Sequence, residues 1–271
     1  CRRRQGAMGR SALSMAVSAD SLPSRMKEAF PASLTPVLVS FGKGKAAEPV
    51  KDGKALSEIV LPEKDIPFFQ MVYVAEQEPY RDFYRRGVGE IAADELRKYI
   101  ALSTGAKLEI VRKPTPGKSA IFLCYAENGL KPEGFRIESR DGNVTITALR
   151  PAVRHTPHDG IYPLLFGTYD FLERFCGIRF YYPGDDGVQV PKKNSLVVPA
   201  LSYSDSPFFE KRQLSGVYEK RGTFRGEFPD HTLHMLRLRA GGNGLFGGNR
   251  SFCHTPWDLT RREGTVKAVP D

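Results

Sequence analysis

The sequence predicts an α+β fold, a mixed β-sheet with two helices packed on one face. Two segments with helical spacing of apolar residues, 89–104 and 160–175, predict the helices. Short segments with alternating or continuous apolar residues surround them and predict the strands. The resulting order is strand, helix, strands, hairpin, helix, strand, and no internal repeat is visible.

Residues 1–54 are rich in Ser, Ala, Pro, Lys and Gly and predict an irregular or disordered lead. The first predicted strands are Glu58–Leu61 and Gln70–Val74. In the helix that follows, one buried face is predicted by the spacing of Ala92, Leu96, Tyr99 and Ile100. Gly105 suits the left-handed position that ends such a helix.

The strands after this helix have distinct signatures. Lys107–Val111 ends at a proline- and glycine-rich stretch, and Ala120–Tyr125 is continuously apolar, as a central strand would be. Residues 134–139 and 143–148 alternate apolar and polar side chains around Asp141-Gly142, which predicts a hairpin with one buried face.

The second helix is predicted to begin after a cap at Asp159, to carry Pro163 in its first turn and to stop at Gly177. Its predicted buried stripe is Ile161, Leu165, Thr168, Leu172 and Phe175. A strand over 178–182 completes an accessory domain of residues 55–203. Residues 204–271 are predicted to form a linker, a short strand over 209–212, a helix over 232–239 with Leu233, Leu236 and Ala240 inward, and a glycine-rich loop over 241–249.

Composition restricts the class of partner. The 271-residue chain has a net charge of +9, but its basic residues are scattered and no nucleic-acid motif accompanies them, so we expect no nucleic-acid partner. No apolar run is long enough for a membrane span. The four cysteines contain no C-x-x-C.

The chain begins with Cys1, which predicts a fragmentary reading frame with Met8 as the start. Residues 11–24 resemble the end of an export signal, and the localisation stays open.

Four blocks occur in a fixed order, and together they resemble one family. They read AADELRKYI with STGAKL (92–108), GFRI (134–137), GTYDFLERFCGIRFY (167–181) and PGDDGVQVP (183–191). They resemble the amino-terminal domain of α-glucuronidases (glycoside hydrolase family 67) and of bacterial proteins with domain of unknown function 4838. A tail, RLRAGG (237–242) and GNRSF (248–252), resembles the "RLR-x-GG…NHSF" stretch of that group, with Arg250 where histidine is expected.

The resemblance implies a fold like the small domain that precedes the barrel in hexosaminidases and α-glucuronidases. It also implies that residues 204–271 are the incomplete start of a (β/α)₈ barrel, with catalytic groups on barrel loops beyond residue 271. The chain is therefore expected to be the non-catalytic amino-terminal portion of a glycoside hydrolase-like protein that acts on a polysaccharide, inactive alone. Its expected partners are carbohydrate, such as an acidic polysaccharide, and its own missing C-terminal barrel. The alternative is a stand-alone sugar-binding or interaction module.

The candidate substrate-binding residues are Arg239, Asn249, Arg250 and Ser251. Glycine-rich backbone beside them allows close approach to a ligand, and arginine pairs well with a uronate carboxylate. No catalytic residue, cofactor or metal is predicted within this chain.

Other polar residues receive structural interpretations. Glu95 and Glu173 are expected to be solvated helix surface, and Asp185-Asp186 is expected to shape a turn. His231 and His234 share a helix face, and Cys253-His254 follows, but no carboxylate stands at a familiar ligand spacing. These histidines are expected to be structural or exposed.

Overall fold

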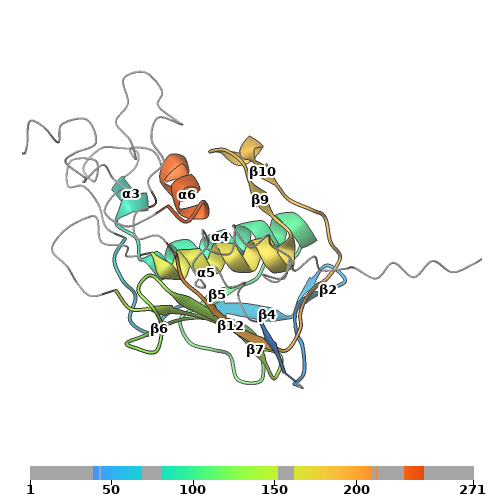
Figure 1. Cartoon of the computed structure of the whole chain (residues 1–271). Coiled ribbons are helices and arrows are strands. Elements are labelled where there is room, and N and C mark those ends of the chain that lie inside the picture. The colour runs from blue at the N-terminus through green and yellow to red at the C-terminus, as the bar shows by residue number, and fades with distance from the viewer. Residues whose placement is uncertain are drawn as a thin grey trace, which may run out of the picture. The chain divides into compact units, whose positions relative to one another are not determined.

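The computed structural model describes residues 39–42, 44–68, 81–151, 162–208, 212 and 229–240. Their centre is a mixed sheet of seven strands in the order β1-β12-β7-β8-β6-β4-β5 (Figure 1). The strands of this sheet are β1 (Ser40–Phe41), β4 (Ser57–Val60), β5 (Ile110–Val111), β6 (Ser119–Ala126), β7 (Phe135–Arg140), β8 (Asn143–Leu149) and β12 (Leu201–Asp205).

Strands β5, β4, β6 and β8 pair parallel with one another, whereas β7 pairs antiparallel with both β8 and β12, and β12 pairs antiparallel with β1. The continuously apolar segment predicted to be central is β6, which lies between β4 and β8. The predicted hairpin is β7 and β8. Its turn residues Asp141 and Gly142 have φ angles of 52° and 81°, as expected for an Asp-Gly hairpin turn.

Helix α4 (Val88–Thr104) confirms the first predicted helix and its buried face, because Ala92, Leu96, Tyr99 and Ile100 are all buried. Gly105 ends it with φ 78°. At the other end, the carboxylate of Asp65 accepts hydrogen bonds from the amides of Gly89 (2.8 Å) and Glu90 (3.2 Å). A residue 24 positions earlier in the chain therefore satisfies the free amides of the first turn.

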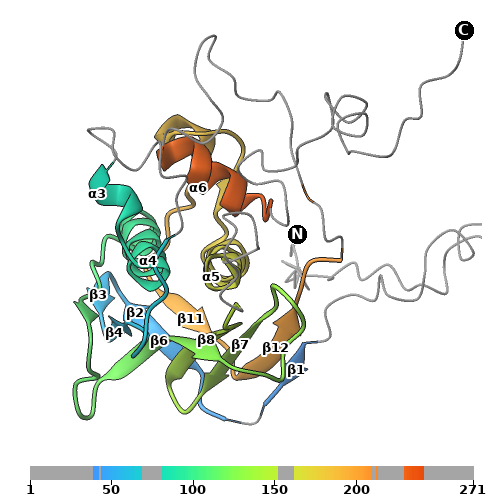
Figure 2. The ribbon, with the colours of Figure 1, turned by 90° about the vertical axis from the view of Figure 1, so that its left-hand side faces the viewer.

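Helix α5 (Pro163–Phe171) starts with Pro163 and continues as a π-helical turn over Leu172–Cys176. All nine residues of α5 are buried, so the helix has no exposed side, whereas the sequence predicted a single buried stripe. The physical reason is that other elements surround it: α5 contacts α4, β7, β8 and the later helix α6 (Pro229–Arg237). Figure 2 shows α4 and α5 side by side on one face of the sheet, where they form a helix layer.

Gly167 lets α5 lie directly on this sheet. A Cβ at this position would lie 2.9 Å from Cγ2 of Ile146 and 3.1 Å from Cγ of Phe135. Distances this short exclude a methyl group without movement of β7, β8 or α5.

Two smaller sheets correct the predicted boundaries. Strand β2 (Ala47–Lys51) pairs with β3 (Lys54–Ala55) and with β11 (Leu196–Val198), so the prediction of an irregular lead is wrong for these residues. The partner of β2 lies about 150 residues away along the chain, beyond the reach of a local pattern. Strand β12 belongs to the main sheet and runs to Asp205, two residues beyond the predicted boundary at 203.

The predicted strand over 178–182 is shorter, β9 (Arg179–Phe180), and it pairs with β10 (Val188–Gln189). Between them, the expected turn at Asp185–Gly187 is one turn of 3₁₀ helix. A short helix, α3 (Arg81–Tyr84), precedes α4. The predicted strand Gln70–Val74, the cap Asp159, and residues 209–211 of the predicted strand over 209–212 lie outside the described residues.

Candidate functional site: the junction between the helix layer and the segment after Asp205

Helix α6 lies in the segment that follows the last strand of the sheet. Leu233, Leu236 and Ala240 are buried, which confirms the predicted inward face, and α6 contacts α5. The helix spans Pro229–Arg237 rather than 232–239. Residues 238–240 form its exit, and two arginines, Arg237 and Arg239, pair with carboxylates on α4 and on the π turn after α5.

The side chain of Arg237 contacts residues of α4, α5 and β9. Its Nη2 and Nε donate hydrogen bonds of 2.8 and 3.2 Å to Oε2 of Glu95 on α4. The side chains of Arg237 and Glu95 are only 4% and 8% exposed. The guanidinium also lies 5.0–5.9 Å from the ring centroids of Phe180, Tyr99 and Tyr169, a range typical of cation–π contacts.

The surroundings of Arg237 favour its charged form. Burial alone would lower the pKa of Arg237, but Glu95 and the phenols of Tyr169 and Tyr99 outweigh burial and keep this pKa above its ordinary value. Burial, followed by the charge of Glu95, raises the pKa of both tyrosines. The pair is thus a desolvated ion pair enclosed by aromatic rings.

The expectation that Glu95 is a solvated surface residue is wrong. The sequence contains the signal for its burial, because Glu95 stands three residues after Ala92 and four before Tyr99, on the apolar face of α4. A carboxylate at such a position requires a buried cation, and Arg237 supplies it 142 residues later.

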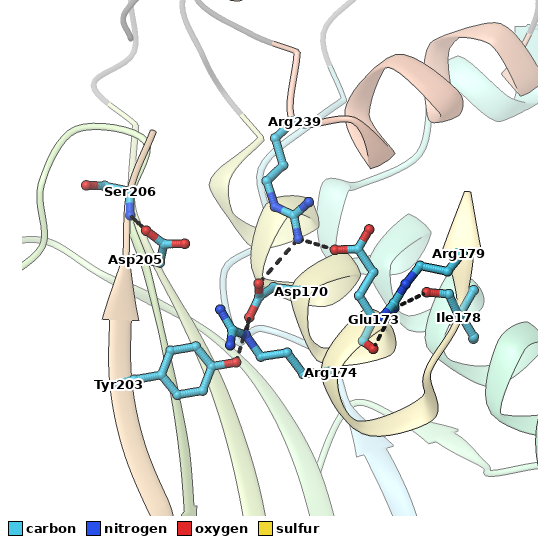
Figure 3. A network of polar contacts seen from close by, with 9 residues as sticks. All are labelled: Asp170, Glu173, Arg174, Ile178, Arg179, Tyr203, Asp205, Ser206 and Arg239. Atoms are coloured by element: carbon cyan, nitrogen blue, oxygen red, sulfur yellow. Dashed lines mark hydrogen bonds and ion pairs between the residues drawn. The ribbon is translucent and has the colours of Figure 1, made fainter. Parts of the chain in front are cut away.

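A second set of contacts surrounds Asp170, near the end of α5 (Figure 3). Its Oδ2 accepts hydrogen bonds from the hydroxyl of Tyr203 at 2.6 Å and from Nε of Arg174 at 2.7 Å. Its Oδ1 is 3.3 Å from Nη2 of Arg239, and the same nitrogen is 2.6 Å from Oε2 of Glu173. The junction therefore joins α5, the π turn, β12 and the exit of α6.

Burial raises the pKa of the Tyr203 phenol, and the carboxylate of Asp170 raises it further. Burial also raises the pKa of Asp205, with Asp170 adding to the effect, although the backbone amide of Ser206 donates a 2.7 Å hydrogen bond to it. Asp170 was not singled out from the sequence. Its signal is a lone carboxylate within the apolar run Leu164–Phe171.

The structure places one of the four candidate substrate-binding residues. Arg239 is at the exit of α6, with its guanidinium between Asp170 and Glu173, so Glu173 is an ion-pair partner, about a quarter exposed, rather than a fully solvated residue. Asn249, Arg250 and Ser251 lie outside the described residues, and sugar binding by the four stays a prediction.

A third arginine of the same segment contributes to the junction. Arg212 pairs with Glu133 in the loop before β7, and its Nε donates a 2.8 Å hydrogen bond to the backbone carbonyl of Arg239. Arg212, Arg237 and Arg239 thus each pair with carboxylates located between residues 95 and 173. At these contacts the residues after Asp205 are basic and their partners are acidic, so the two sides are complementary in charge.

The contacts suit holding elements together. The carboxylates of Glu95, Asp170 and Glu173 each accept hydrogen bonds from an arginine. In the described ranges, no group of three or more His, Cys, Asp or Glu is placed to hold a metal ion. The side chain of His231 and the residues Cys253 and His254 lie outside the described part of the structure. His234 is buried. No helix within the described part of the chain is long and apolar enough to cross a membrane.

Comparisons with solved structures find glycoside hydrolase family 20 enzymes. A Streptomyces plicatus β-hexosaminidase with bound GlcNAc is 17% identical to this chain, with a TM-score of 0.39. The β-N-acetylhexosaminidase of Streptomyces coelicolor is 18% identical, with a TM-score of 0.40. Each match covers 66% of this chain and 26% of the solved protein. A Flavobacterium johnsoniae chitobiase is 15% identical with a TM-score of 0.35, over 66% and 21%. The chain thus spans about a quarter of these solved proteins or less. Such identities and TM-scores assign no function.

No model of a known protein family matches the chain, and no curated protein matches it. The resemblance of the sequence blocks to the α-glucuronidase amino-terminal domain therefore stays a prediction.

Proposed function

We propose that residues 39–205 form a non-catalytic supporting domain of a glycoside hydrolase-like, carbohydrate-active protein, and that the segment after Asp205 begins the domain it supports. The single observation that carries this proposal is the buried ion pair of Glu95 and Arg237. It joins the helix layer to a helix beyond the sheet, in a setting where an unpaired partner would be costly.

The sequence blocks give the proposal its substrate class. Glu95 belongs to the first block, Asp170 and Glu173 belong to the third, and Arg237 and Arg239 belong to the tail. The ion pairs therefore connect the blocks on which the resemblance to α-glucuronidases rests. In that family the corresponding domain precedes a catalytic barrel, so polysaccharide is the expected substrate of the whole protein.

An activity assay tests the non-catalytic role. The purified 271-residue chain, with folding verified by circular dichroism, is incubated with aryl glycosides of uronic acids, hexosamines and neutral hexoses. We expect no release of the aryl group above the rate without protein. Turnover that follows the protein through purification and disappears on unfolding would contradict the proposal.

A further inference from the structure

The end of α6 differs from the ends of α4 and of the π turn in one respect. Helix α4 and the π turn after α5 both end at a glycine in the left-handed conformation, Gly105 at φ 78° and Gly177 at φ 75°. After the last residue of α6, Arg237, the residue in the left-handed conformation is Arg239, with φ 55°. Glycine is favoured at this position because a side chain strains the left-handed backbone, and the chain places two glycines, Gly241 and Gly242, just beyond it.

The arginine side chain is not needed to terminate the helix. The amide of Arg239 donates a 2.9 Å hydrogen bond to the carbonyl of Leu236, and the amide of Ala240 donates one of 2.9 Å to the carbonyl of Met235. These two bonds are the pattern of a Schellman motif, in which only the backbone takes part. Glycine would make the same bonds with less strain.

Among the described residues, three other non-glycine residues have positive φ angles: Asp52, Glu133 and Asp141. Asp52 and Asp141 stand directly before a glycine in a hairpin turn, where aspartate is well tolerated. Glu133 is different, because it pairs with Arg212, and Arg212 also donates to the carbonyl of Arg239. Two strained residues, Glu133 and Arg239, are therefore held by one arginine.

We propose that Arg239 is a positioning residue that fixes the direction in which the chain leaves α6. Its guanidinium lies between Asp170 and Glu173, while its carbonyl accepts from Arg212, so both ends of the residue are held. This inference rests on the proposed supporting role. In the sequence, this exit is followed by the glycine-rich stretch and by the predicted sugar-binding residues Asn249–Ser251.

The substitution Arg239→Gly separates the two interpretations because they predict opposite results. If the arginine only ends the helix, glycine relieves strain, and α6 becomes more protected. If it positions the exit, the loss of the contacts with Asp170 and Glu173 outweighs the relief of strain, and α6 becomes less protected from exchange. Native-state hydrogen exchange of amides 234–240 is then expected to become about tenfold faster, the size expected for charged hydrogen bonds, with β6 and β8 unchanged.

Two further variants complete the experiment. Asp52→Gly places glycine at another positive φ angle, 47°, where the side chain is exposed, and is expected to leave α6 exchange unchanged. Glu173→Gln is expected to accelerate α6 exchange in the wild-type chain but to have no effect once Arg239 is glycine. Unchanged or slower exchange in Arg239→Gly, or equal effects of Glu173→Gln in both backgrounds, would overturn the inference. Aryl glycoside turnover would contradict the supporting role and leave these results standing.

Discussion

Arg237 and Glu95 are two charged residues in a buried environment. Two charges have been removed from water, and three aromatic rings enclose the cation. Desolvation of this kind offsets much of the attraction, so the pair specifies where α6 docks more than it stabilises the fold. Its two residues therefore depend on each other.

We predict that Arg237→Met lowers the free energy of unfolding by about 3 kcal/mol, because it leaves the Glu95 carboxylate buried without its cation. Urea denaturation followed by circular dichroism measures this change. The double variant Glu95→Leu/Arg237→Met is expected to recover most of the loss. If the two single substitutions were additive in the double variant, Glu95 and Arg237 would not be coupled.

Glu58 is a second buried carboxylate, located on β4. It accepts hydrogen bonds from the amide (2.6 Å) and the hydroxyl (2.9 Å) of Thr115, and Nζ of Lys118 lies 3.5 Å away. Burial alone would raise the pKa of Glu58, but these hydrogen bonds and the charge of Lys118 outweigh it and hold the pKa below its ordinary value of 4.5.

This pKa predicts a loss of stability in acid. A carboxyl group whose pKa is lower in the folded state stabilises the protein fully above its unfolded pKa of 4.5 and loses this contribution as the pH falls through the folded value. We expect Glu58→Gln to lower stability at pH 7 and to flatten its decline below pH 4.5. Urea titrations from pH 3 to pH 7 measure both, and parallel pH profiles for the two proteins would contradict the prediction.

At the scale of elements, the contact between α5 and the sheet determines the spacing of the layers. Gly167 of α5 faces Ile146 and Phe135 of the sheet, and a Cβ at this position would meet both. Replacing an interior helical glycine with alanine normally gains up to about 1 kcal/mol of helix propensity. Here the extra methyl group overpacks the core, a change that costs about 1–3 kcal/mol.

We therefore predict that Gly167→Ala destabilises the protein by about 1 kcal/mol, measured as a shift of the urea midpoint. A matched control is Gly44→Ala, where the new Cβ would be 3.8 Å from its nearest neighbour, Cβ of Ala200. It is expected to change stability by less than about 0.5 kcal/mol. A stabilised Gly167→Ala protein would show that the layers move apart without cost.

Elements defined by local sequence could be predicted, and elements defined by distant pairing could not. The face of α4, its end at Gly105 and the β7–β8 turn each depend on residues within a few positions of one another. Strand β2 (AEPVK) holds no apolar run and contains Pro49, and its partner β11 lies far along the chain. The apolar neighbours of Glu95 and Asp170 indicate burial, but the partners Arg237 and Arg239 come from another segment, so the local sequence does not predict the ion pairs that they form.

For the whole molecule, the main consequence is that the helix layer is incomplete without the segment after Asp205. Helix α5 is buried on every side, and α6 is one of the elements that contact it. The buried side of α6 includes Leu233 and Leu236. Removing α6 therefore uncovers apolar surface on the helix layer.

We predict that a chain ending at Asp205 loses about 3 kcal/mol or more of stability, since burial of each leucine contributes at least about 1.5 kcal/mol. Thermal unfolding and binding of a hydrophobic dye measure the loss and the exposed surface. A chain ending at Ala240 keeps α6 and is the matched control. Equal unfolding temperatures for the chains ending at Asp205 and Ala240 would show that the helix layer is complete without α6.

The π turn ends with Cys176, which is buried, and burial raises the pKa of its thiol to about 12. Only a thiolate reacts quickly with maleimides, so this sulfur is shielded both chemically and sterically while the layers stay closed. Its alkylation requires an opening that separates the π turn from its neighbours, among them α4 and β11. Pulsed maleimide labelling of this one sulfur atom, located by mass spectrometry, would report the rate of such openings.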